Sequence, residues 1–386
     1  MSLPVQYRRR GQAVWLDTIS NRMIREGRLG SLISDGTVYG VTSNPSIFGQ
    51  SIQKNEGDYG HALVRHAEAG ADAFSIYDQL TRRDIAEAAD LFRPQHAENP
   101  EDGYVSLEVL PSLAHDAHAT VDEARRLHDL LGRPNVLIKV PATRAGLSAV
   151  RTLIGHGVSV NVTLMFNRAH YRDVASAYIA GVEDLLAAGG DPTKVRSVAS
   201  FFVSRTDTLV DKLLDEKIAA ASSPAEQEHL ASLKGKAGVA NSRVVYQDFL
   251  SIFGSPRFRA LAGRGASVQR PLWASTGTKN PAYSDLLYVE NLVGPDTVNT
   301  MPEKTLEALL DHGRDLGDSV LDGVEAARRT LEDLAAAGID VEAVGEKLQE
   351  DGVVLFAKAY DDLLATIETR RAEAVQNLSR TQKVVR

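Results

Sequence analysis

The sequence predicts an α/β fold in which eight parallel strands close into a single (β/α)8 barrel of the TIM type. Short runs rich in Val and Ile alternate eight times with longer amphipathic stretches. Gly, Pro, Asn or Asp bounds each short run, as expected of a strand covered by helices on both faces. The expected strands are Ala13–Asp17, Val38–Thr42, Tyr104–Val109, Val136–Val140, Val158–Thr163, Val195–Val203, Pro271–Thr276 and Asp296–Thr300.

Apolar residues at helical spacing predict the helices. The clearest examples are Pro111–Leu131, Asn167–Ala188 and Arg205–Ala221. Ile47–Asp102 and Ser222–Gly265 are expected to be helix-rich insertions, and an almost continuous helical region follows the last strand. No fixed repeat or low-complexity linker divides the chain. We therefore expect one domain over residues 1–386, although about 150 residues per domain would allow two or three.

Composition excludes several classes of protein. The chain is 43% hydrophobic and 24% charged, unlike a disordered or collagen-like protein. It has no cysteine, so disulfides, thiol nucleophiles, iron–sulfur clusters and cysteine zinc sites are excluded. A net charge of −8 argues against a nucleic-acid partner but allows a local basic pocket for a phosphorylated metabolite. Neither a signal-peptide core nor a membrane-length apolar stretch is present, so we expect a cytoplasmic protein.

Polar side chains recur at the carboxyl ends of the first six expected strands. In a closed α/β barrel these ends meet at one mouth, where functional groups gather. Two carboxylates, a lysine, two amides and several hydroxyls at one mouth describe an active site better than a structural core. The polar residues are Asp17, Asn44, Glu108, Lys139, Asn161, Thr163, Ser200 and Arg205, and the aromatic Phe202 stands with them at the end of the sixth strand.

Lys139 is the most informative single residue. It lies in the run Val-Leu-Ile-Lys-Val-Pro, where a charged ammonium is expensive to bury. Taken alone, such a lysine more often protects a sheet edge or extends its amine to solvent. A closed barrel has no edge strand, so the barrel prediction favours a desolvated amine that attacks a carbonyl and forms an imine.

Asp17 and Glu108 are the candidate acid–base groups. Asp17 stands between a strand and a helix, where the structural alternative is a helix N-cap. Glu108 lies among Val and Leu, where the alternative is an ion pair with a neighbouring lysine. Two carboxylates beside a lysine suit imine chemistry, which needs several proton transfers and a positioned water.

Signals for a metal or a dinucleotide are weak, and we predict neither a metal nor another cofactor. His115–His118 places two histidines and an aspartate one turn apart on an expected helix, but no further ligand is evident. Gly155–Gly157 and Gly263–Gly265 lack the third glycine and the later acidic residue of a dinucleotide loop, so we expect turns there.

Six short motifs follow one another along the first six expected strands and cover residues 13–205 densely. They are Trp-Leu-Asp17-Thr-Ile-Ser, Gly-Val-Thr-Ser-Asn44-Pro-Ser-Ile-Phe, Ser-Leu-Glu108-Val, Ile-Lys139-Val-Pro-Ala-Thr, Asn161-Val-Thr163-Leu and Ser200-Phe-Phe202-Val-Ser-Arg205. In this order they resemble the motifs of transaldolases. Later residues resemble only the longer bacterial form of that family, chiefly through Trp273-Ala-Ser-Thr-Gly-Thr-Lys279-Asn.

The resemblance implies a metal-free transfer between two sugar phosphates in the non-oxidative pentose phosphate pathway. Lys139 would form an imine with the ketone of fructose 6-phosphate or sedoheptulose 7-phosphate. Cleavage of the C3–C4 bond would release glyceraldehyde 3-phosphate or erythrose 4-phosphate, and the dihydroxyacetone unit would pass to the other aldose phosphate. The implied partners are small-molecule sugar phosphates, without nucleic acid or membrane, and the oligomeric state stays open.

The same resemblance implies roles for the other residues at the mouth. Asp17 would take the proton of the C4 hydroxyl, while Glu108 and Thr163 would hold the water that moves protons during imine formation. The substrate hydroxyls would bind to Asn44, Asn161 and Ser200.

Phosphate binding is the point at which the sequence departs from its relatives. The resemblance implies that Arg205 binds the phosphate, where a planar guanidinium suits a two-pronged contact. Shorter transaldolases have a second phosphate-binding arginine after the serine that matches Ser275. Here Thr-Gly-Thr-Lys279 follows, so Lys279 and a glycine-rich turn are expected to take over.

Two alternative functions fit the same fold. A fructose-6-phosphate aldolase would release free dihydroxyacetone, but such proteins are much shorter and resemble transaldolases with Gln and Tyr where this chain has Glu108 and Phe202. A non-catalytic sugar-phosphate-binding barrel would not need Lys139, Asp17, Glu108 and Thr163 together.

Overall fold

Eight parallel strands close into a barrel in the computed structural model, which describes residues 2–54 and 59–384. The strands follow one another in chain order, and β1 closes the barrel against β8. The predicted (β/α)8 barrel is confirmed, and each strand end lies within two residues of its expected position. The strands are β1 (Gln12–Leu16), β2 (Gly40–Val41), β3 (Tyr104–Glu108), β4 (Val136–Pro141), β5 (Val160–Met165), β6 (Ser197–Phe202), β7 (Arg270–Ala274) and β8 (Thr297–Met301).

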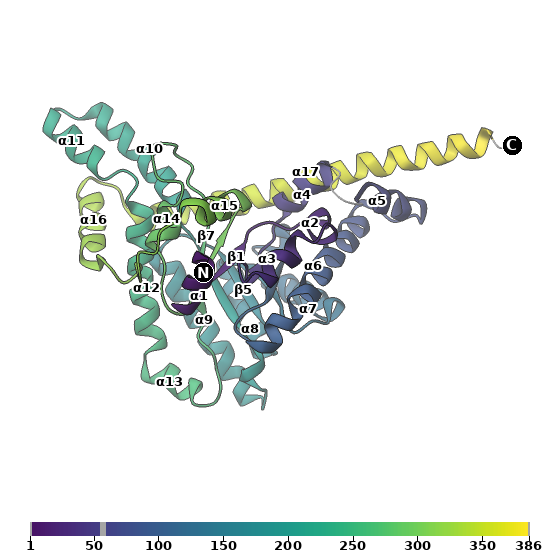
Figure 1. Ribbon diagram of the computed structural model, residues 1–386, viewed down its shortest axis with the longest axis horizontal. Helices are drawn as coiled ribbons and strands as arrows, with labels where there is room; N and C mark the ends of the chain where they lie inside the picture. Colours follow the sequence, from purple (N-terminus) through teal and green to yellow (C-terminus); the bar gives the residue numbers. More distant parts are fainter. Residues whose placement is uncertain (1, 55–58, 385–386) are drawn as a thin grey trace.

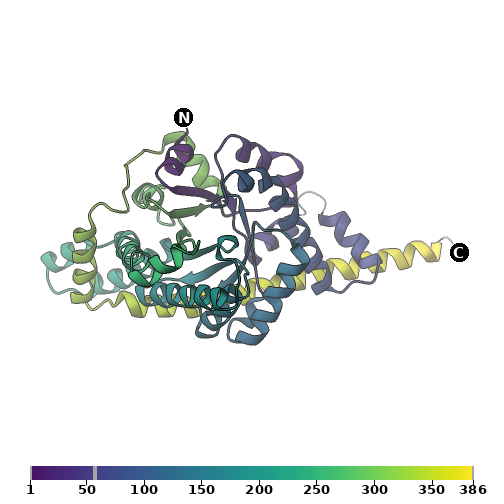
Figure 2. The same cartoon turned by 90° about the horizontal axis from the view of Figure 1, so that it is seen from below.

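Helices surround the barrel (Figures 1 and 2). Among the described residues, none of them is both long and apolar enough to cross a membrane. The α-helices are α1 (Leu3–Arg9), α2 (Asn21–Arg25), α3 (Arg28–Ser34), α4 (Pro45–Gln53), α5 (Tyr59–Glu68), α6 (Ala73–Glu98), α7 (Ala117–Leu131), α8 (Arg144–Gly155), α9 (Arg168–Ala187), α10 (Ser204–Ala220), α11 (Pro224–Ser232), α12 (Ala237–Phe253), α13 (Pro256–Ala262), α14 (Leu287–Asn291), α15 (Glu303–His312), α16 (Val324–Ala336) and α17 (Val341–Val384).

Two helix predictions need correction. The expected helix Pro111–Leu131 is a 3-10 turn followed by α7, because the side chain of Asp116 caps α7 by accepting a hydrogen bond from the Ala119 amide. The C-terminal region, expected to be almost continuously helical, is interrupted between α15 and α16. Gly317 and Gly323 adopt left-handed backbone conformations there, with φ of 77° and 63°, which a regular helix does not contain.

Side chains alternate between the barrel interior and the surrounding helices along each strand. In β1, Ala13 and Trp15 face the interior, whereas Val14 and Leu16 pack toward the helices. Gly40 on β2 makes room for the indole of Trp15, since a Cβ atom there would lie 2.5 Å from the ring. The same alternation turns every second residue at the strand ends toward the mouth of the barrel.

The C-terminal helix α17 is the longest element, with 44 residues. It packs against α4, α5, α6 and α10 and also contacts β5. Figures 1 and 2 show it in yellow, running along the body and projecting beyond it at the C-terminal end. One long helix thereby connects elements that lie far apart in the sequence.

Candidate active site

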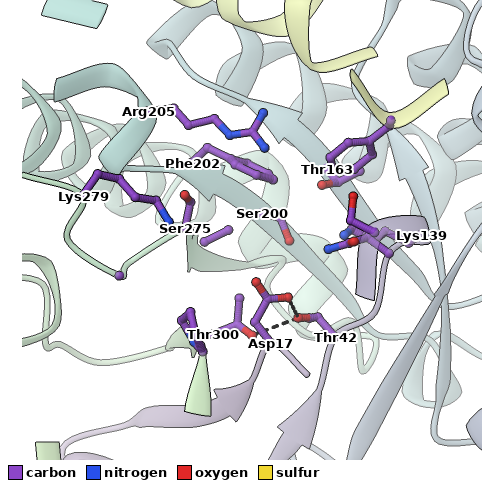
Figure 3. Close-up of a pocket in the computed structure, with 16 residues that line it drawn as sticks. Asp17, Thr42, Lys139, Thr163, Ser200, Phe202, Arg205, Ser275, Lys279 and Thr300 are labelled. Carbon is purple, nitrogen blue, oxygen red and sulfur yellow. Dashed lines mark hydrogen bonds between the residues drawn. The ribbon is translucent and has the colours of Figure 1, made fainter. Parts of the chain in front are cut away.

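A pocket of about 190 Å³ opens at the carboxyl ends of the strands (Figure 3). Nine of the eleven residues predicted for the site line it, and Glu108 and Asn161 are the two that do not. The predicted residues in the lining are Asp17, Asn44, Lys139, Thr163, Ser200, Phe202, Arg205, Ser275 and Lys279. The others are Thr42, Ser46, Ala274, Gly277, Thr300, Pro302 and Phe356.

Strand register brings the central groups together. Glu108 on β3 pairs with Lys139 on β4, and Lys139 pairs with Asn161 on β5. The side chains on either side of Lys139 in β4, Ile138 and Val140, pack toward the helices. The apolar run that surrounds Lys139 in the sequence is therefore the outer face of a buried strand, while Lys139 itself points to the mouth.

The amine of Lys139 is almost completely buried. The residue is 4% exposed, and its Nζ atom donates a hydrogen bond to the carbonyl oxygen of Ser43 at 3.2 Å. Oε2 of Glu108 lies 3.6 Å from Nζ, and the ring of Phe356 is centred 5.8 Å from it. The amine therefore faces a hydrogen-bond acceptor, a carboxylate and an aromatic ring inside a small pocket.

Glu108 and Thr163 present buried oxygen atoms near this amine. Burial raises the pKa of Glu108 to about 7, the charge of Lys139 opposes that rise, and Asp17 adds to it. Oε2 of Glu108 and Oγ1 of Thr163 have no hydrogen-bond partner among the described residues. Because buried polar atoms in proteins are nearly always paired, these two are suited to hold a water molecule or a substrate hydroxyl.

Asp17 lies at the opposite wall of the pocket from the end of β4. Its Oδ1 atom accepts a hydrogen bond from the hydroxyl of Thr42 at 2.8 Å, and that hydroxyl lies 2.9 Å from the hydroxyl of Thr300 (Figure 3). The helix that follows β1 is capped by Ser20 and not by Asp17. The N-cap alternative for Asp17 is therefore wrong, and its carboxylate faces the pocket.

The residues expected to hold substrate hydroxyls differ in accessibility. Asn44 lines the pocket, while its Oδ1 atom caps α4 by accepting from the Ile47 amide at 3.1 Å. Ser200 also lines the pocket and donates to Oδ1 of Asn161 at 2.7 Å. Asn161 is fully buried and lies behind this serine, where its Nδ2 atom donates to Ser106.

The cationic end of the pocket lies away from Lys139 in Figure 3, where Arg205 and Lys279 are seen. Burial lowers the pKa of the Arg205 guanidinium, although the charge of Asp17 acts in the opposite direction. The guanidinium lies over the ring of Phe202, 5.4 Å from its centre. No carboxylate is within ion-pair distance of Arg205 among the described residues.

Asp207 and Asp211 have other partners, so they do not neutralise Arg205. Asp207 accepts hydrogen bonds from the Gly238 amide and from the hydroxyl of Tyr288. Asp211 accepts from the Gly235 amide and the hydroxyl of Tyr283. Neither aspartate therefore forms an ion pair with Arg205 among the described residues.

Ser275 shows backbone strain at this end of the pocket. Its φ is 55°, in the left-handed region that residues other than glycine rarely adopt. Its hydroxyl lies 2.9 Å from that of Ser204, at the start of α10. Lys279 follows on the same loop and is exposed.

No group of three or more His, Cys, Asp or Glu side chains in the described part of the chain is placed to hold a metal ion. The three residues considered for this role include Asp116, whose carboxylate caps α7. His115 lies before that helix begins, so the expected spacing of the two histidines on one helix is wrong.

Seven lining residues were not among the predicted site residues, and three of these, Thr42, Thr300 and Phe356, have contacts described above. Thr42 and Thr300 stand at the mouth end of the barrel, so the rule that selected the other residues could have found them. Phe356 comes from α17, and no motif or spacing in the sequence indicates that this helix reaches the pocket.

Comparison with known proteins gives a consistent family. The model for the family described as Transaldolase/Fructose-6-phosphate aldolase matches residues 14–367. A Transaldolase from Saccharopolyspora erythraea is 47% identical over 364 residues, which are 94% of this chain and 96% of that protein. Transaldolase 1 from Streptomyces coelicolor is 48% identical over 358 residues, or 92% of each protein. A Transaldolase from Mycolicibacterium smegmatis is 46% identical over 355 residues, which are 92% of this chain and 93% of that protein.

Proposed function

Since the chain belongs to the transaldolase/fructose-6-phosphate aldolase family and is a transferase of the transaldolase class, we propose that it works through an imine on Lys139. The observation that carries this proposal is a lysine amine at 4% exposure beside the carboxylate of Glu108 in the pocket. Burying both groups costs desolvation free energy, and groups buried in this way are typical of functional sites. An amine held beside a carboxylate is suited to attack a ketone.

The proposed donors are fructose 6-phosphate and sedoheptulose 7-phosphate. Lys139 adds to the ketone carbon, and loss of water gives the protonated imine. Glu108, with the water that it holds together with Thr163, moves the protons of this step. Both residues have a buried oxygen atom without a hydrogen-bond partner among the described residues, which leaves room for this water. The raised pKa of Glu108, about 7, also supports the role because both protonation states are accessible near neutrality.

Carbon–carbon cleavage is assigned to Asp17. Its carboxylate takes the proton of the C4 hydroxyl, the C3–C4 bond breaks and an aldose phosphate leaves. The electron pair of the broken bond moves into the imine, so a dihydroxyacetone enamine stays on Lys139. This enamine adds to glyceraldehyde 3-phosphate or erythrose 4-phosphate, and Asp17 returns the proton to the new C4 oxygen. Water then hydrolyses the resulting imine, which releases the new ketose phosphate and restores the amine of Lys139.

Substrate binding is proposed for the remaining residues. Arg205 holds the phosphate, supported by Lys279, while Asn44 and Ser200 bind hydroxyls and Asn161 orients Ser200. Ser275 shapes the phosphate end through its contact with Ser204. We also propose a cytoplasmic location and a place in the non-oxidative pentose phosphate pathway, because both follow from the proposed sugar-phosphate substrates.

Reductive trapping tests this proposal. Borohydride treatment with fructose 6-phosphate should add a dihydroxyacetone-sized mass to the peptide that contains Lys139 and to no other lysine peptide. Lys139→Ala should abolish the label, whereas Lys279→Ala, a change of another lysine in the same pocket, should retain it. Labelling of a different lysine would overturn the assignment.

Product analysis separates the alternative functions. With fructose 6-phosphate and erythrose 4-phosphate, a transaldolase forms sedoheptulose 7-phosphate. Free dihydroxyacetone as the main product would identify a fructose-6-phosphate aldolase, and absence of both turnover and label would identify a non-catalytic binding protein.

A further inference from the structure

One face of helix α17 forms part of the pocket wall. Gly345, Gln349, Gly352 and Phe356 are spaced four, three and four residues apart, which places them on one side of an α-helix. Figure 3 shows the yellow ribbon of this helix beside Thr163 and Lys139. The C-terminal region is therefore part of the site and not only an addition to the outside of the barrel.

Gln349 fastens this face to the strand ends. Its Nε2 atom donates hydrogen bonds to the carbonyl oxygens of Ala142 at 3.1 Å and Leu164 at 2.9 Å. Ala142 directly follows β4, the strand of Lys139, and Leu164 directly follows Thr163 in β5. The helix is thus hydrogen-bonded to the backbone close to both of these site residues.

Two glycines let the helix approach this closely. A Cβ atom at Gly345 would lie 2.5 Å from the Cβ atom of Asn167, and one at Gly352 would lie 3.1 Å from a methyl group of Leu164. Glycine inside a helix lowers its stability relative to alanine. Docking against the barrel, and not the helix itself, accounts for these two positions.

Phe356 is the residue that this docking brings into the pocket. It is 6% exposed, lines the pocket and has its ring centre 5.8 Å from Nζ of Lys139. The preceding residues on the same helix, Val354 and Leu355, are 67% and 53% exposed. They therefore offer matched positions where an apolar side chain can be shortened without touching the site.

We propose that Phe356 is a specificity-determining residue that keeps water from the Lys139 imine while the dihydroxyacetone fragment waits for its acceptor. This inference rests on the proposed function. The side reaction is hydrolysis: the enamine carbon takes the proton held by Asp17, which gives the protonated imine, and water then adds to the imine carbon and the C–N bond breaks. The water oxygen becomes the ketone oxygen of free dihydroxyacetone, and both water protons end on the nitrogen of Lys139.

Two properties of the ring favour transfer over hydrolysis. An apolar wall at the amine excludes solvent from one side of the imine, which limits attack by water. The face of an aromatic ring also attracts a cation within about 6 Å, so it holds the positively charged nitrogen of the imine against this apolar wall. Shortening the side chain to alanine removes both effects.

The test measures how the adduct partitions. Phe356→Ala, Phe356→Leu and the control Leu355→Ala are supplied with fructose 6-phosphate and erythrose 4-phosphate, and free dihydroxyacetone and sedoheptulose 7-phosphate are measured. We expect the ratio of release to transfer to rise about fivefold or more in Phe356→Ala, the factor that corresponds to losing a contact of this kind. Phe356→Leu, which keeps apolar volume but no aromatic face, should rise less, and Leu355→Ala should match the parent.

The outcomes separate this inference from the proposed function. If borohydride traps no adduct on Lys139 in the parent enzyme, the proposed function fails. If trapping is normal in all variants and the ratio is unchanged in Phe356→Ala, only the role of Phe356 fails. The ratio of release to transfer does not depend on the amount of folded enzyme, so an equal loss of both products also counts against the role of Phe356. If Phe356→Ala does not fold, Phe356→Leu provides the measurement.

Discussion

Asp17 and Thr42 are linked by a hydrogen bond of 2.8 Å between the ends of the neighbouring strands β1 and β2, from the threonine hydroxyl to Oδ1 of the carboxylate. Thr42 in turn contacts the hydroxyl of Thr300 at 2.9 Å. One oxygen of Asp17 is thereby fixed by two strands that flank β1, and the other oxygen is left to accept a proton from the substrate. The chain of hydroxyls makes Thr42 a positioning residue.

Replacement of Thr42 by valine should disorder the carboxylate of Asp17 while keeping the shape of the side chain. We expect kcat to fall about tenfold to a hundredfold with little change in KM, since loss of one hydrogen bond to a charged group costs on the order of 1.5–3 kcal/mol. Thr42→Ser restores the hydroxyl and should recover most of the rate. Loss of activity in both variants, with lowered thermal stability, would indicate a packing role instead.

Glu108 should set the acid limb of the pH–rate profile. Its pKa is raised to about 7, so the carboxylate form that accepts the proton of Lys139 disappears as the pH falls below that value. In the parent enzyme, kcat/KM should therefore decrease as the pH falls below about 7. Glu108→Gln should lack this limb and turn over at least about a hundredfold more slowly than the parent.

Asp17→Asn is the matched control for this assignment. The charge of Asp17 contributes to the raised pKa of Glu108, so its removal should move the acid limb to lower pH. That variant should also be slow, but with the limb still present. An acid limb that stays near pH 7 in Glu108→Gln would mean that another group titrates there.

The same pKa shift predicts a pH-dependent stability. Burial raises the pKa of Glu108 from 4.5 to about 7, so between these values the folded state holds a proton that the unfolded state has lost. The contribution of Glu108 is therefore fully present below about pH 4.5 and is lost as the pH rises through 7. In Glu108→Gln this change is absent.

Denaturant unfolding of both proteins from pH 4.5 to 8 measures this contribution. The free energy of unfolding of the parent, relative to Glu108→Gln, should decrease by at most about 1.4 kcal/mol per pH unit up to pH 7 and then level off. A difference that does not change with pH would show that Glu108 has the same pKa in the folded and unfolded states.

The barrel and most of the pocket were predictable because strand geometry has a period of two. Once strands are recognised by their Val-rich runs, the alternation fixes which residues face the interior. Glu108, Lys139 and Ser200 follow from that rule alone, and the structure places them at the mouth. The rule also covers Thr42 and Thr300, which the sequence interpretation passed over. Thr42 lies in a motif from which only Asn44 was selected, and Thr300 lies in none of the motifs.

Tertiary docking was beyond what the sequence could predict. The docking of α17 depends on Gly345 and Gly352 fitting against partners nearly two hundred residues earlier, and helical periodicity says only that a buried face exists. The register shift in β5 between Val162 and Met165, with Leu164 at a φ of 63°, also lacks a glycine that would have signalled it.

Arg205 and Lys279 differ in environment, and this difference predicts unequal contributions to phosphate binding. Arg205 is half-buried and has no carboxylate neighbour among the ion pairs of the described residues, whereas Lys279 is exposed on a loop. A desolvated guanidinium can make two charge-assisted hydrogen bonds to one phosphate. An exposed ammonium contributes a weaker interaction that salt screens.

Arg205→Ala should lower kcat/KM for fructose 6-phosphate. The equivalent loss of transition-state stabilisation is on the order of 2–3 kcal/mol, the scale of a lost hydrogen bond to a charged group. For Lys279→Ala the corresponding free-energy loss should be only about 0.2–1 kcal/mol, and smaller at high salt. Neither change should affect the slow reaction of unphosphorylated fructose, because that substrate has no group for the cations to hold. Steady-state kinetics with both sugars measures the difference. Equal losses on fructose and fructose 6-phosphate in Arg205→Ala would mean that the guanidinium has a structural role, packed on the ring of Phe202. A larger loss in Lys279→Ala than in Arg205→Ala would assign phosphate binding to the loop after β7.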